Sequence, residues 1–269
     1  MALKPIVTIA TYIVKRLTQS GHSEVHFERR IRDLYKNEIC TNRGDSMLVN
    51  VNAASAGKQN ALGELGELSR ARVNLSEFRY NRSAEIYGET EPADYIYQVV
   101  DGAVRTYKLL SDGRRQIGAF HLAGDIFGLE NGSVHRFTAE AIVDTTVRLV
   151  KRRSLEHVAR ADVHVALDLL NMTTTSLQHA EEHMLLLGRK TSLERVAAFL
   201  MEMDRRLSAA GIMALPMSRR DIADYLGLTL ETVSRALSYL HEKGILGFLG
   251  QTQRQIVLLD RVHLSELEL

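Results

Sequence analysis

The sequence predicts an α+β protein made of an antiparallel β-roll of the jelly-roll type, a long helix, and a C-terminal helix-turn-helix with a two-stranded wing. Short β-rich runs separated by turn residues predict the β-roll. Apolar residues at alternating spacings of three and four predict the long helix, and a helix–glycine–helix pattern followed by two strand-like runs predicts the winged unit. We place these parts at 67–160, 161–189 and 190–269, after an extension and linker of unknown role at 1–66.

Composition indicates a folded protein without strong overall charge. The chain has 269 residues, of which 45% are hydrophobic and 25% charged, so global disorder is excluded. Its net charge is +1, so any nucleic-acid binding has to come from local placement of charge. The single cysteine, Cys40, excludes an intramolecular disulfide and fits a reducing compartment. No apolar run approaches the roughly 20 residues of a membrane helix, so we expect a cytoplasmic protein.

The β-roll is predicted from runs of strand-forming residues at roughly ten-residue spacing. The runs are YIYQVV, AVRTYKLL, RQIGAFHL and TAEAIVDTTVRLVKR, and the breaks are EPAD, VDG, SDG and AGD. The SDG sequence between two such runs is a good hairpin signal. Several short strands with this spacing favour a small antiparallel barrel or jelly roll.

The long helix carries an apolar seam that repeats every three or four residues over three heptads. The seam positions are Val163, Ala166, Leu170, Thr173, Leu177, Ala180, Met184 and Leu187. Such a helix can pack on its own domain or pair with a second copy. We favour pairing, because near-strict heptad spacing is narrower than the apolar stripe of a globular helix. The predicted dimer contacts are Val163, Leu170, Leu177, Ala180, Met184 and Leu187.

Two helices joined by a glycine form the most informative stretch, SRRDIADYLGLTLETVSRALSYLHE at residues 218–242. The helix before it, at 192–207, has Ser192 in position to cap it. Gly227 marks the tight turn and Thr229 is the expected N-cap of the second helix. The positions expected to face the core are Ile222, Ala223 and Leu226 in the first helix and Val233, Leu237 and Leu240 in the second. The following run, EKGILGFLGQTQRQIVLLD, predicts the wing.

The N-terminal turn of the second helix then presents side chains suited to reading DNA. We predict base contacts from Leu230, Glu231, Ser234 and Arg235, and phosphate contacts from Ser218, Arg219, Arg220, Thr229 and Thr232. Arginine pairs with guanine, and glutamate accepts from cytosine N4. The alternative is an ordinary surface ion pair, because Glu231 and Arg235 are four residues apart on one helix.

Three motifs resemble one known family. They are LSDGRRQIGAFHLAGDIFGLE at 110–130, LLGRKTSLERVAAFL at 186–200 and MSRRDIADYLGLTLETVSRAL at 217–237. In these motifs, within a span of about 80–262, the chain resembles the cyclic-AMP-receptor/FNR superfamily of bacterial transcription regulators, most closely its FixK branch. The resemblance implies a β-roll like a cyclic-nucleotide-binding domain, a dimerisation helix and a winged helix-turn-helix.

The resemblance also implies a function. In the family, the pattern E-x-x-S-R goes with TTGA…TCAA palindromes. Here the pattern is Glu231, Ser234 and Arg235, with Leu230 preceding it as in the FixK branch. A homodimer would place two helices in successive major grooves about 34 Å apart, and β-roll loops around 111–115 would contact RNA polymerase. The implied targets are genes of low-oxygen respiration, nitrogen fixation or denitrification.

The resemblance leaves two modes of control open. In the first, the regulator has no bound cofactor and its abundance sets its activity. In the second, it is a ligand-gated receptor whose β-roll binds a cyclic nucleotide, haem or another small molecule. We favour the first. The chain carries no G-x-S-x-G, no P-loop and no CxxC pair, so we expect no enzyme.

For a cyclic nucleotide and for an iron–sulfur cluster, the sequence lacks part of the set of residues that would bind the ligand. The region 124–141 has Glu130 and Arg136, but Phe137 stands where nucleotide-binding members carry a small hydroxyl residue. A cysteine-held iron–sulfur cluster is excluded within one chain, and Arg148 stands near where the cysteine of the roll would fall.

Haem or metal binding would have to use histidines. The candidates are His121 and His135 for haem, and His179 and His183 for a metal, since the last two are four residues apart on a helix. We favour polar, non-ligating roles for these histidines, and inert packing over a redox role for Cys40. We therefore expect neither cofactor nor metal.

Overall fold

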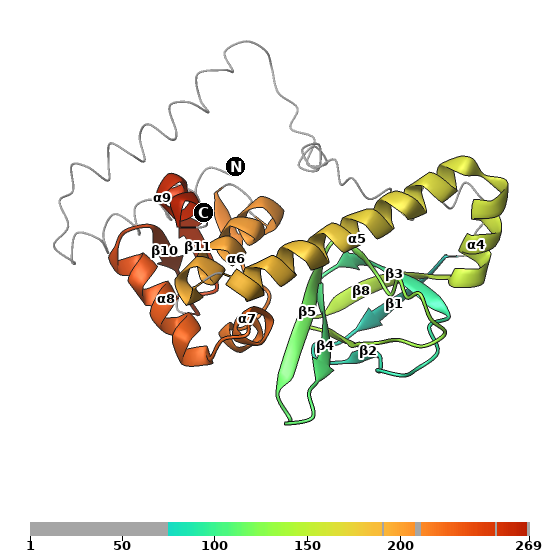
Figure 1. Cartoon of the computed structure of the whole chain (residues 1–269), viewed down its shortest axis with the longest axis horizontal. Coiled ribbons are helices and arrows are strands. Elements are labelled where there is room, and N and C mark those ends of the chain that lie inside the picture. The colour runs from blue at the N-terminus through green and yellow to red at the C-terminus, as the bar shows by residue number, and fades with distance from the viewer. Residues whose placement is uncertain (1–74, 190, 208–210, 251, 268–269) are drawn as a thin grey trace, which may run out of the picture. The chain divides into compact units, whose positions relative to one another are not determined.

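The computed structural model describes residues 75–189, 191–207, 211–250 and 252–267 (Figure 1). The predicted extension and linker, with Cys40, lie outside the described residues. The β-roll consists of eight described strands: β1 (Leu75–Tyr80), β2 (Glu85–Tyr87), β3 (Tyr95–Asp101), β4 (Ala103–Leu109), β5 (Arg115–Leu122), β6 (Ile126–Phe127), β7 (Thr138–Ala141) and β8 (Thr145–Lys151).

The strands form two four-stranded antiparallel sheets, with the orders β1-β8-β3-β6 and β2-β7-β4-β5. Side chains from both sheets meet in one cluster that includes Tyr97, Val99, Val104, Phe127 and Val147. Every second residue of a strand points to this shared interior, which is why the strands alternate apolar and polar positions. The predicted antiparallel β-roll is confirmed.

All four predicted strand runs appear, as β3, β4, β5 and the pair β7–β8. The SDG sequence makes the turn between β4 and β5, where Gly113 has a φ of 81°. Strands β1, β2 and β6 were not among the predicted runs. They are short or largely exposed, so they carry little of the alternating pattern that predicts a strand.

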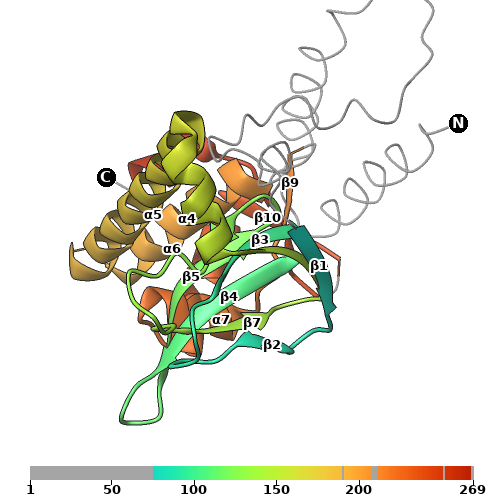
Figure 2. The same cartoon turned by 90° about the vertical axis from the view of Figure 1, so that its right-hand side faces the viewer.

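Two helices follow the β-roll, α4 (Arg152–Ala161) and α5 (Val163–Arg189). Helix α4 ends at Asp162, whose backbone is extended. Figure 2 shows α4 and α5 beside the strands of the roll. The inner face of α5 packs on the roll through Val165, Leu169 and Met172, which contact the same cluster as Ile96 and Val150. No helix among the described residues has the length and apolar character needed to cross a bilayer.

Helix α6 (Ser192–Leu207) begins at Ser192, the residue that was predicted to cap it. Thr191, not Ser192, makes the capping contacts: its backbone N–H donates to Glu194 Oε2 at 2.8 Å, and the Glu194 N–H donates to Thr191 Oγ1 at 3.4 Å. This is a capping box, in which a hydroxyl residue is followed three residues later by a side chain that accepts a hydrogen bond, such as Glu, Gln or Asp. Ser192 is followed three residues later by Arg195, so the box cannot form there.

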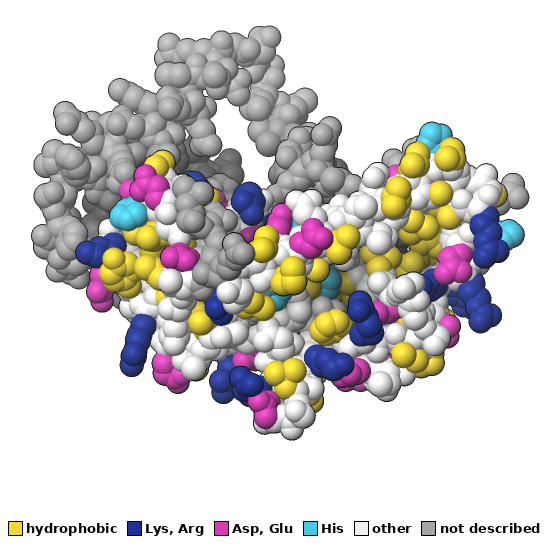
Figure 3. Space-filling view, in the orientation of Figure 1, with side chains coloured by type: hydrophobic (Ala, Val, Ile, Leu, Met, Phe, Trp, Pro, Cys, Tyr) yellow, Lys and Arg dark blue, Asp and Glu magenta, His cyan; other side chains and the backbone are white. Residues whose placement is uncertain are grey.

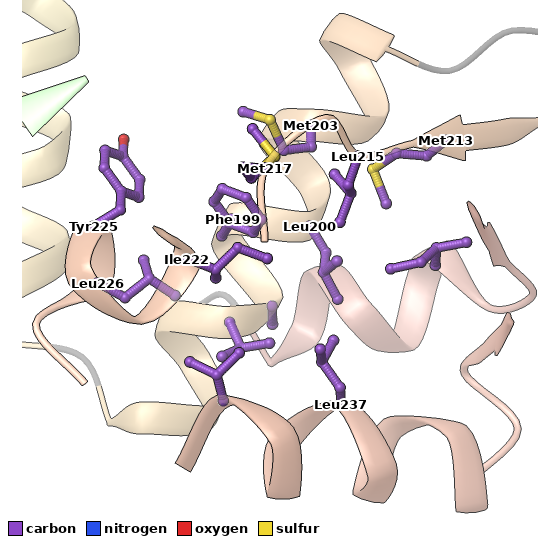
Figure 4. Packing of buried hydrophobic residues seen from close by; sticks show 14 of the residues in the cluster. Phe199, Leu200, Met203, Met213, Leu215, Met217, Ile222, Tyr225, Leu226 and Leu237 are labelled. Carbon is purple, nitrogen blue, oxygen red and sulfur yellow. The ribbon is translucent and has the colours of Figure 1, made fainter. Parts of the chain in front are cut away.

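The C-terminal unit is a three-helix core with a small sheet. Its remaining elements are β9 (Ile212–Ala214), α7 (Arg219–Leu226), α8 (Leu230–Glu242), β10 (Leu246–Leu249), β11 (Gln255–Leu258) and α9 (Arg261–Glu266). Strands β10 and β11 are the predicted wing, and β9, which was not predicted, extends it to the order β10-β11-β9. Figure 4 shows Phe199 and Leu200 of α6 beside Ile222 of α7 and Leu237 of α8.

The six positions predicted to face the core of this unit are all buried. They are Ile222, Ala223, Leu226, Val233, Leu237 and Leu240. This agreement follows from helical periodicity, because residues three and four apart share one face.

One carboxylate joins the β-roll to α7. Asp221 Oδ1 accepts from Arg105 of β4 at 2.9 Å and from Arg115 of β5 at 2.6 Å. Its other oxygen, Oδ2, accepts from the Ser218 N–H at 2.9 Å and from the Ser218 hydroxyl at 2.7 Å. Arg115 also donates to Asp224 at 2.9 Å. The Asp221 side chain is 5% exposed, so these charges interact with little screening by water.

We expect Asp221→Asn to lower the free energy of unfolding by about 3 kcal/mol, because it leaves two partly buried arginines without their shared charge. The control is Asp112→Asn, because the ion pair between Asp112 and Arg114 is exposed to solvent. This control should leave the unfolding midpoint unchanged. Since the chain has no tryptophan, urea unfolding is followed by circular dichroism at one protein concentration. A midpoint for Asp221→Asn equal to that of the control would contradict the prediction.

The same carboxylate predicts a pH dependence. Burial by itself raises the pKa of Asp221, but the hydrogen bonds from Ser218 and the charges of Arg105 and Arg115 outweigh it and hold the pKa below 3.8. A lowered pKa stabilises the fold above the unfolded-state value, and this stabilisation is lost as pH falls through the folded-state value. The difference in stability between wild type and Asp221→Asn should therefore shrink as pH drops below about 4. A difference that stays constant from neutral pH down through this range would refute the assignment.

Candidate nucleic-acid interface

Two caps fix the geometry of the helix-turn-helix. Ser218 caps α7 in a capping box with Asp221, as its Oγ accepts from the Asp221 N–H while the Asp221 side chain accepts from the Ser218 N–H. Helix α7 ends at Gly227, whose φ of 62° lies in the left-handed region that favours glycine. Thr229 then caps α8 by accepting from the Thr232 N–H at 3.2 Å. The predicted roles of Gly227 and Thr229 in shaping this turn are confirmed.

The first turns of α8 present the four predicted base-contact residues with different exposure. Glu231 and Arg235 are exposed, whereas Leu230 and Ser234 are half-buried. Within the described part of the chain, Glu231 and Arg235 make no ion pair with each other. The surface pair that was the alternative explanation for these two residues is therefore not formed, and both side chains extend into solvent.

Glu231 is held in its ionised form by the helix terminus. Hydrogen bonds from its own backbone N–H and from the Thr229 hydroxyl lower its pKa, and the nearby charges of Arg220 and Arg235 act in the same direction. An ionised carboxylate has only acceptor positions. It is therefore matched to a donor such as the N4 amino group of cytosine.

Arg219 connects α7, α8 and the wing. Its guanidinium donates to the Ser234 Oγ at 3.4 Å and to the Gln253 side chain, and it lies 5.7 Å from the ring centre of Phe248. Gln253, with a φ of 54°, belongs to the turn of the wing. Sequence reasoning missed Gln253 and Phe248, since nothing in a wing pattern specifies which residues touch α7. Arg219 is consequently a buttress for α8 as well as a predicted phosphate contact.

The other predicted phosphate contacts differ in the donors they have left. The hydroxyls of Thr229 and Thr232 lie 3.0 Å apart and hydrogen-bond to each other, and the Thr229 hydroxyl also bonds to Glu231, so a phosphate contact there would have to replace one of these bonds. Ser218 donates both its N–H and its O–H to Asp221, so a phosphate contact there would have to break the capping box. Arg220 is exposed at the start of α7.

The predicted dimer seam forms the outer face of α5. Val163 and Met184 are each 66% exposed, and Leu170 and Leu177 are each 57% exposed. Ala180 is exposed as well, whereas Leu187 is half-buried. Figure 3 shows apolar side chains recurring along this helix. The residues that pack on the roll, such as Met172, lie on the opposite face, so packing within one chain does not explain the seam.

The β-roll does not present the cradle that a cyclic nucleotide needs. Arg136, which would hold the phosphate, has a side chain 73% exposed and donates to Glu130 at 3.1 Å. Glu130 is buried, and its backbone carbonyl accepts from Arg152. The Phe137 ring lies 3.3 Å from the position of a Cβ at Gly118, so it occupies the space beside β5. A buried phosphate requires an inward-pointing arginine, and the exposed Arg136, which pairs with Glu130, does not meet this requirement.

The histidines of the roll sit among aromatic rings. His135 stacks on Tyr87 with ring centres 3.6 Å apart and is 1% exposed, and its two ring nitrogens have no hydrogen-bond partner among the described residues. His121 stacks on Phe127 and contacts the Thr106 hydroxyl at 3.2 Å. Burial lowers the pKa of His121 to about 4, so this ring is neutral at physiological pH.

The two candidate metal ligands of α5, His179 and His183, do not converge on a metal. His183 contacts the Tyr225 carbonyl at 2.9 Å and stacks on that ring, whereas His179 is exposed. In the described ranges, no three His, Cys, Asp or Glu side chains come together as metal ligands. The His183 contact instead joins α5 to the end of α7.

Comparison with known proteins identifies both parts of the fold. The Crp-like helix-turn-helix domain matches residues 194–267, and the cyclic nucleotide-binding domain matches residues 77–162. The nitrogen fixation regulation protein FixK of Azorhizobium caulinodans is 45% identical over 194 residues, which cover 70% of this chain and 77% of that protein. FixK of Rhizobium meliloti is 46% identical over 167 residues, 62% of this chain and 76% of that protein.

A solved structure agrees with these relatives. FixK2 from Bradyrhizobium japonicum is 69% identical, with a TM-score of 0.71, and the match covers 73% of this chain and 98% of that one. These relatives are regulators rather than enzymes, and FixK2 shares the fold described above. The chain belongs to the FixK branch of the cyclic-AMP-receptor/FNR family of transcription regulators.

Proposed function

We propose that the protein is a homodimeric regulator that binds a TTGA-N6-TCAA-like palindrome through α8. The observation that carries this proposal is the presentation of Glu231 and Arg235, exposed and unpaired with each other, at the start of a capped helix. That part of a recognition helix reaches the base edges in the major groove. Arg235 would pair with guanine and Glu231 with cytosine, while Ser234 and Leu230 would contact the neighbouring bases.

A dimer formed through α5 would explain why the binding site is a palindrome. The exposed apolar seam of α5 has the heptad spacing of a two-stranded coiled coil. A two-fold axis along this helix would relate two copies of α8, and operator symmetry follows from protein symmetry. Arg219, Arg220, Thr229 and Thr232 would contact phosphates and fix the register of each half-site.

The relatives suggest what the regulator controls. The two FixK relatives are named for the regulation of nitrogen fixation, and we propose targets of that kind, together with genes of low-oxygen respiration. The β4–β5 hairpin around 111–115 is exposed and would contact RNA polymerase. We place the protein in the cytoplasm, where its DNA would be.

We propose that DNA binding needs no cofactor, because Arg136 and Glu130 bond to each other rather than forming a nucleotide cradle. The test is a fluorescence-anisotropy titration of ligand-free protein with a TTGA-N6-TCAA duplex and a scrambled duplex, at fixed salt, with and without cyclic AMP. Tight and selective binding without additive is expected. Selective binding only with the nucleotide would make the protein a ligand-gated receptor instead.

Replacing Arg235 tests the contact to a base. Arg235→Ala should weaken binding to the palindrome by roughly 1–3 kcal/mol and relax the preference at one base pair of each half-site. The measurement is anisotropy against a set of duplexes with single base changes. Arg205→Ala, an exposed arginine of α6, should leave the base preference unchanged. An unaltered preference in Arg235→Ala would remove Arg235 from the recognition scheme.

Replacing Leu177 tests the dimer. Leu177→Glu places an unpaired charge in the centre of the seam and should yield monomers in sedimentation experiments. Affinity for the palindrome should fall about 100-fold or more, since two linked half-sites bind far more tightly than one. Val262→Glu, at an equally exposed apolar residue of α9, is the matched control and should stay dimeric. A dimeric Leu177→Glu protein would show that α5 does not form the interface.

A further inference from the structure

A basic cavity of about 230 Å³ lies where the β-roll meets the C-terminal unit. We call it the arginine pocket. Its lining includes Arg82, Arg105 and Arg115 of the β-roll, and Ser218, Arg220, Asp221 and Arg254 of the C-terminal unit. The pocket is smaller than the roughly 300–1,000 Å³ typical of sites for drug-sized ligands. At about 30 Å³ for each water, it has room for a small ion with a few waters.

The charges that line the pocket do not balance. Asp221 is its one carboxylate, and Oδ1 of Asp221 is shared by Arg105 and Arg115. Outside the lining, Glu140 pairs with Arg105 and Asp224 with Arg115. Even with these two acids counted, the arginines exceed the carboxylates by two.

The excess positive charge comes from three arginines. Within the described residues, no acidic side chain lies in ion-pair distance of Arg82, Arg220 or Arg254. Among the described residues, the hydrogen bond of Arg82 is made by its backbone N–H, which donates to Asp144. These three guanidiniums come from the β1–β2 turn, the start of α7 and the turn of the wing, which are far apart in the sequence. Folding therefore brings like charges together at a cost, which an anion in the pocket would remove.

Arg105 adds a buried donor without an acceptor. Its two terminal nitrogens bond to Asp221 and Glu140, but its Nε has no partner in the described structure and is inaccessible to solvent. Buried donors are normally satisfied, so this unpaired N–H adds to the excess of positive charge around the pocket.

We infer that the arginine pocket binds a phosphate group. Guanidinium forks donate pairs of parallel hydrogen bonds to phosphate oxygens, and a tetrahedral anion can accept from arginines that approach from several directions. The phosphate can belong to the DNA backbone beside the sequence read by α8, or to a free phosphate-bearing molecule. In both cases it would contact the β-roll and α7 together, and so would add to the link that Asp221 makes.

The first arm of the test uses inorganic phosphate as the probe. Full-length protein in phosphate-free buffer at low salt is titrated by calorimetry. Wild type should bind one phosphate per chain, and the double variant Arg82→Gln/Arg254→Gln should bind at least tenfold more weakly. Neither arginine holds an ion pair that the fold depends on. Arg79→Gln, an exposed arginine of β1 outside the pocket, is the matched control and should bind as wild type does.

The second arm identifies the source of the phosphate. Arg82→Gln and Arg79→Gln are compared on a duplex limited to the palindrome and on one with about one helical turn added at each end. If DNA supplies the phosphate, Arg82→Gln weakens binding only to the longer duplex, and the slope of log affinity against log salt falls by about one for each protomer.

The two arms together decide the inference. Loss of phosphate binding in the double variant, or a length-dependent loss of DNA binding in Arg82→Gln, supports phosphate binding in the pocket. The experiment in which binding weakens identifies the source of the phosphate. The inference fails if the double variant binds phosphate as wild type does and Arg82→Gln binds both duplexes as Arg79→Gln does. It also fails if Arg79→Gln weakens the binding of phosphate or DNA as much as the pocket variants do. Because phosphate binding is measured without DNA, a wrong palindrome would not affect the first arm.

Discussion

The carboxylate of Asp221 is the constraint on which the arrangement of the two described parts depends. One oxygen completes the cap of α7 with Ser218, and the other accepts from Arg105 and Arg115 of the β-roll. The cap of α7 and an attachment of the helix-turn-helix to the β-roll therefore share one buried group. The side chain at this position has to be short, charged and an acceptor on both sides. A longer or neutral side chain would satisfy only part of this requirement.

Regular periodicity explains what the sequence could predict. Val233, Leu237 and Leu240 repeat with helical spacing in α8, so the core of the helix-turn-helix could be predicted, and the turn at Gly227 was marked by its residue type. Contacts between distant segments leave no local pattern. For that reason the ion pairs of Asp221, the buttress from Arg219 to Gln253 and the unpaired arginines around the pocket appeared only in three dimensions.

Aromatic side chains occupy much of the space between the two sheets of the β-roll. Rings of Tyr87, Tyr97, Phe127 and His135 stack on one another where the two sheets face each other. Aromatic pairs of this kind add to the stability gained from burial. Arg136 points outward to an acid instead of inward to a phosphate. The roll is thus suited to serve as a rigid support for α5 and for the hairpin that reaches α7.

The exposure of Glu231 and Arg235 has an evolutionary consequence. Neither side chain belongs to the buried cluster that holds α6, α7 and α8 together, and the capping bond of α8 runs from the Thr232 N–H to Thr229. Exchanges at such surface positions usually change stability little. With the proposed base contacts of Glu231 and Arg235, a duplicated gene would acquire a different operator while keeping the same fold, which would let a genome separate two regulatory circuits by altering very few codons.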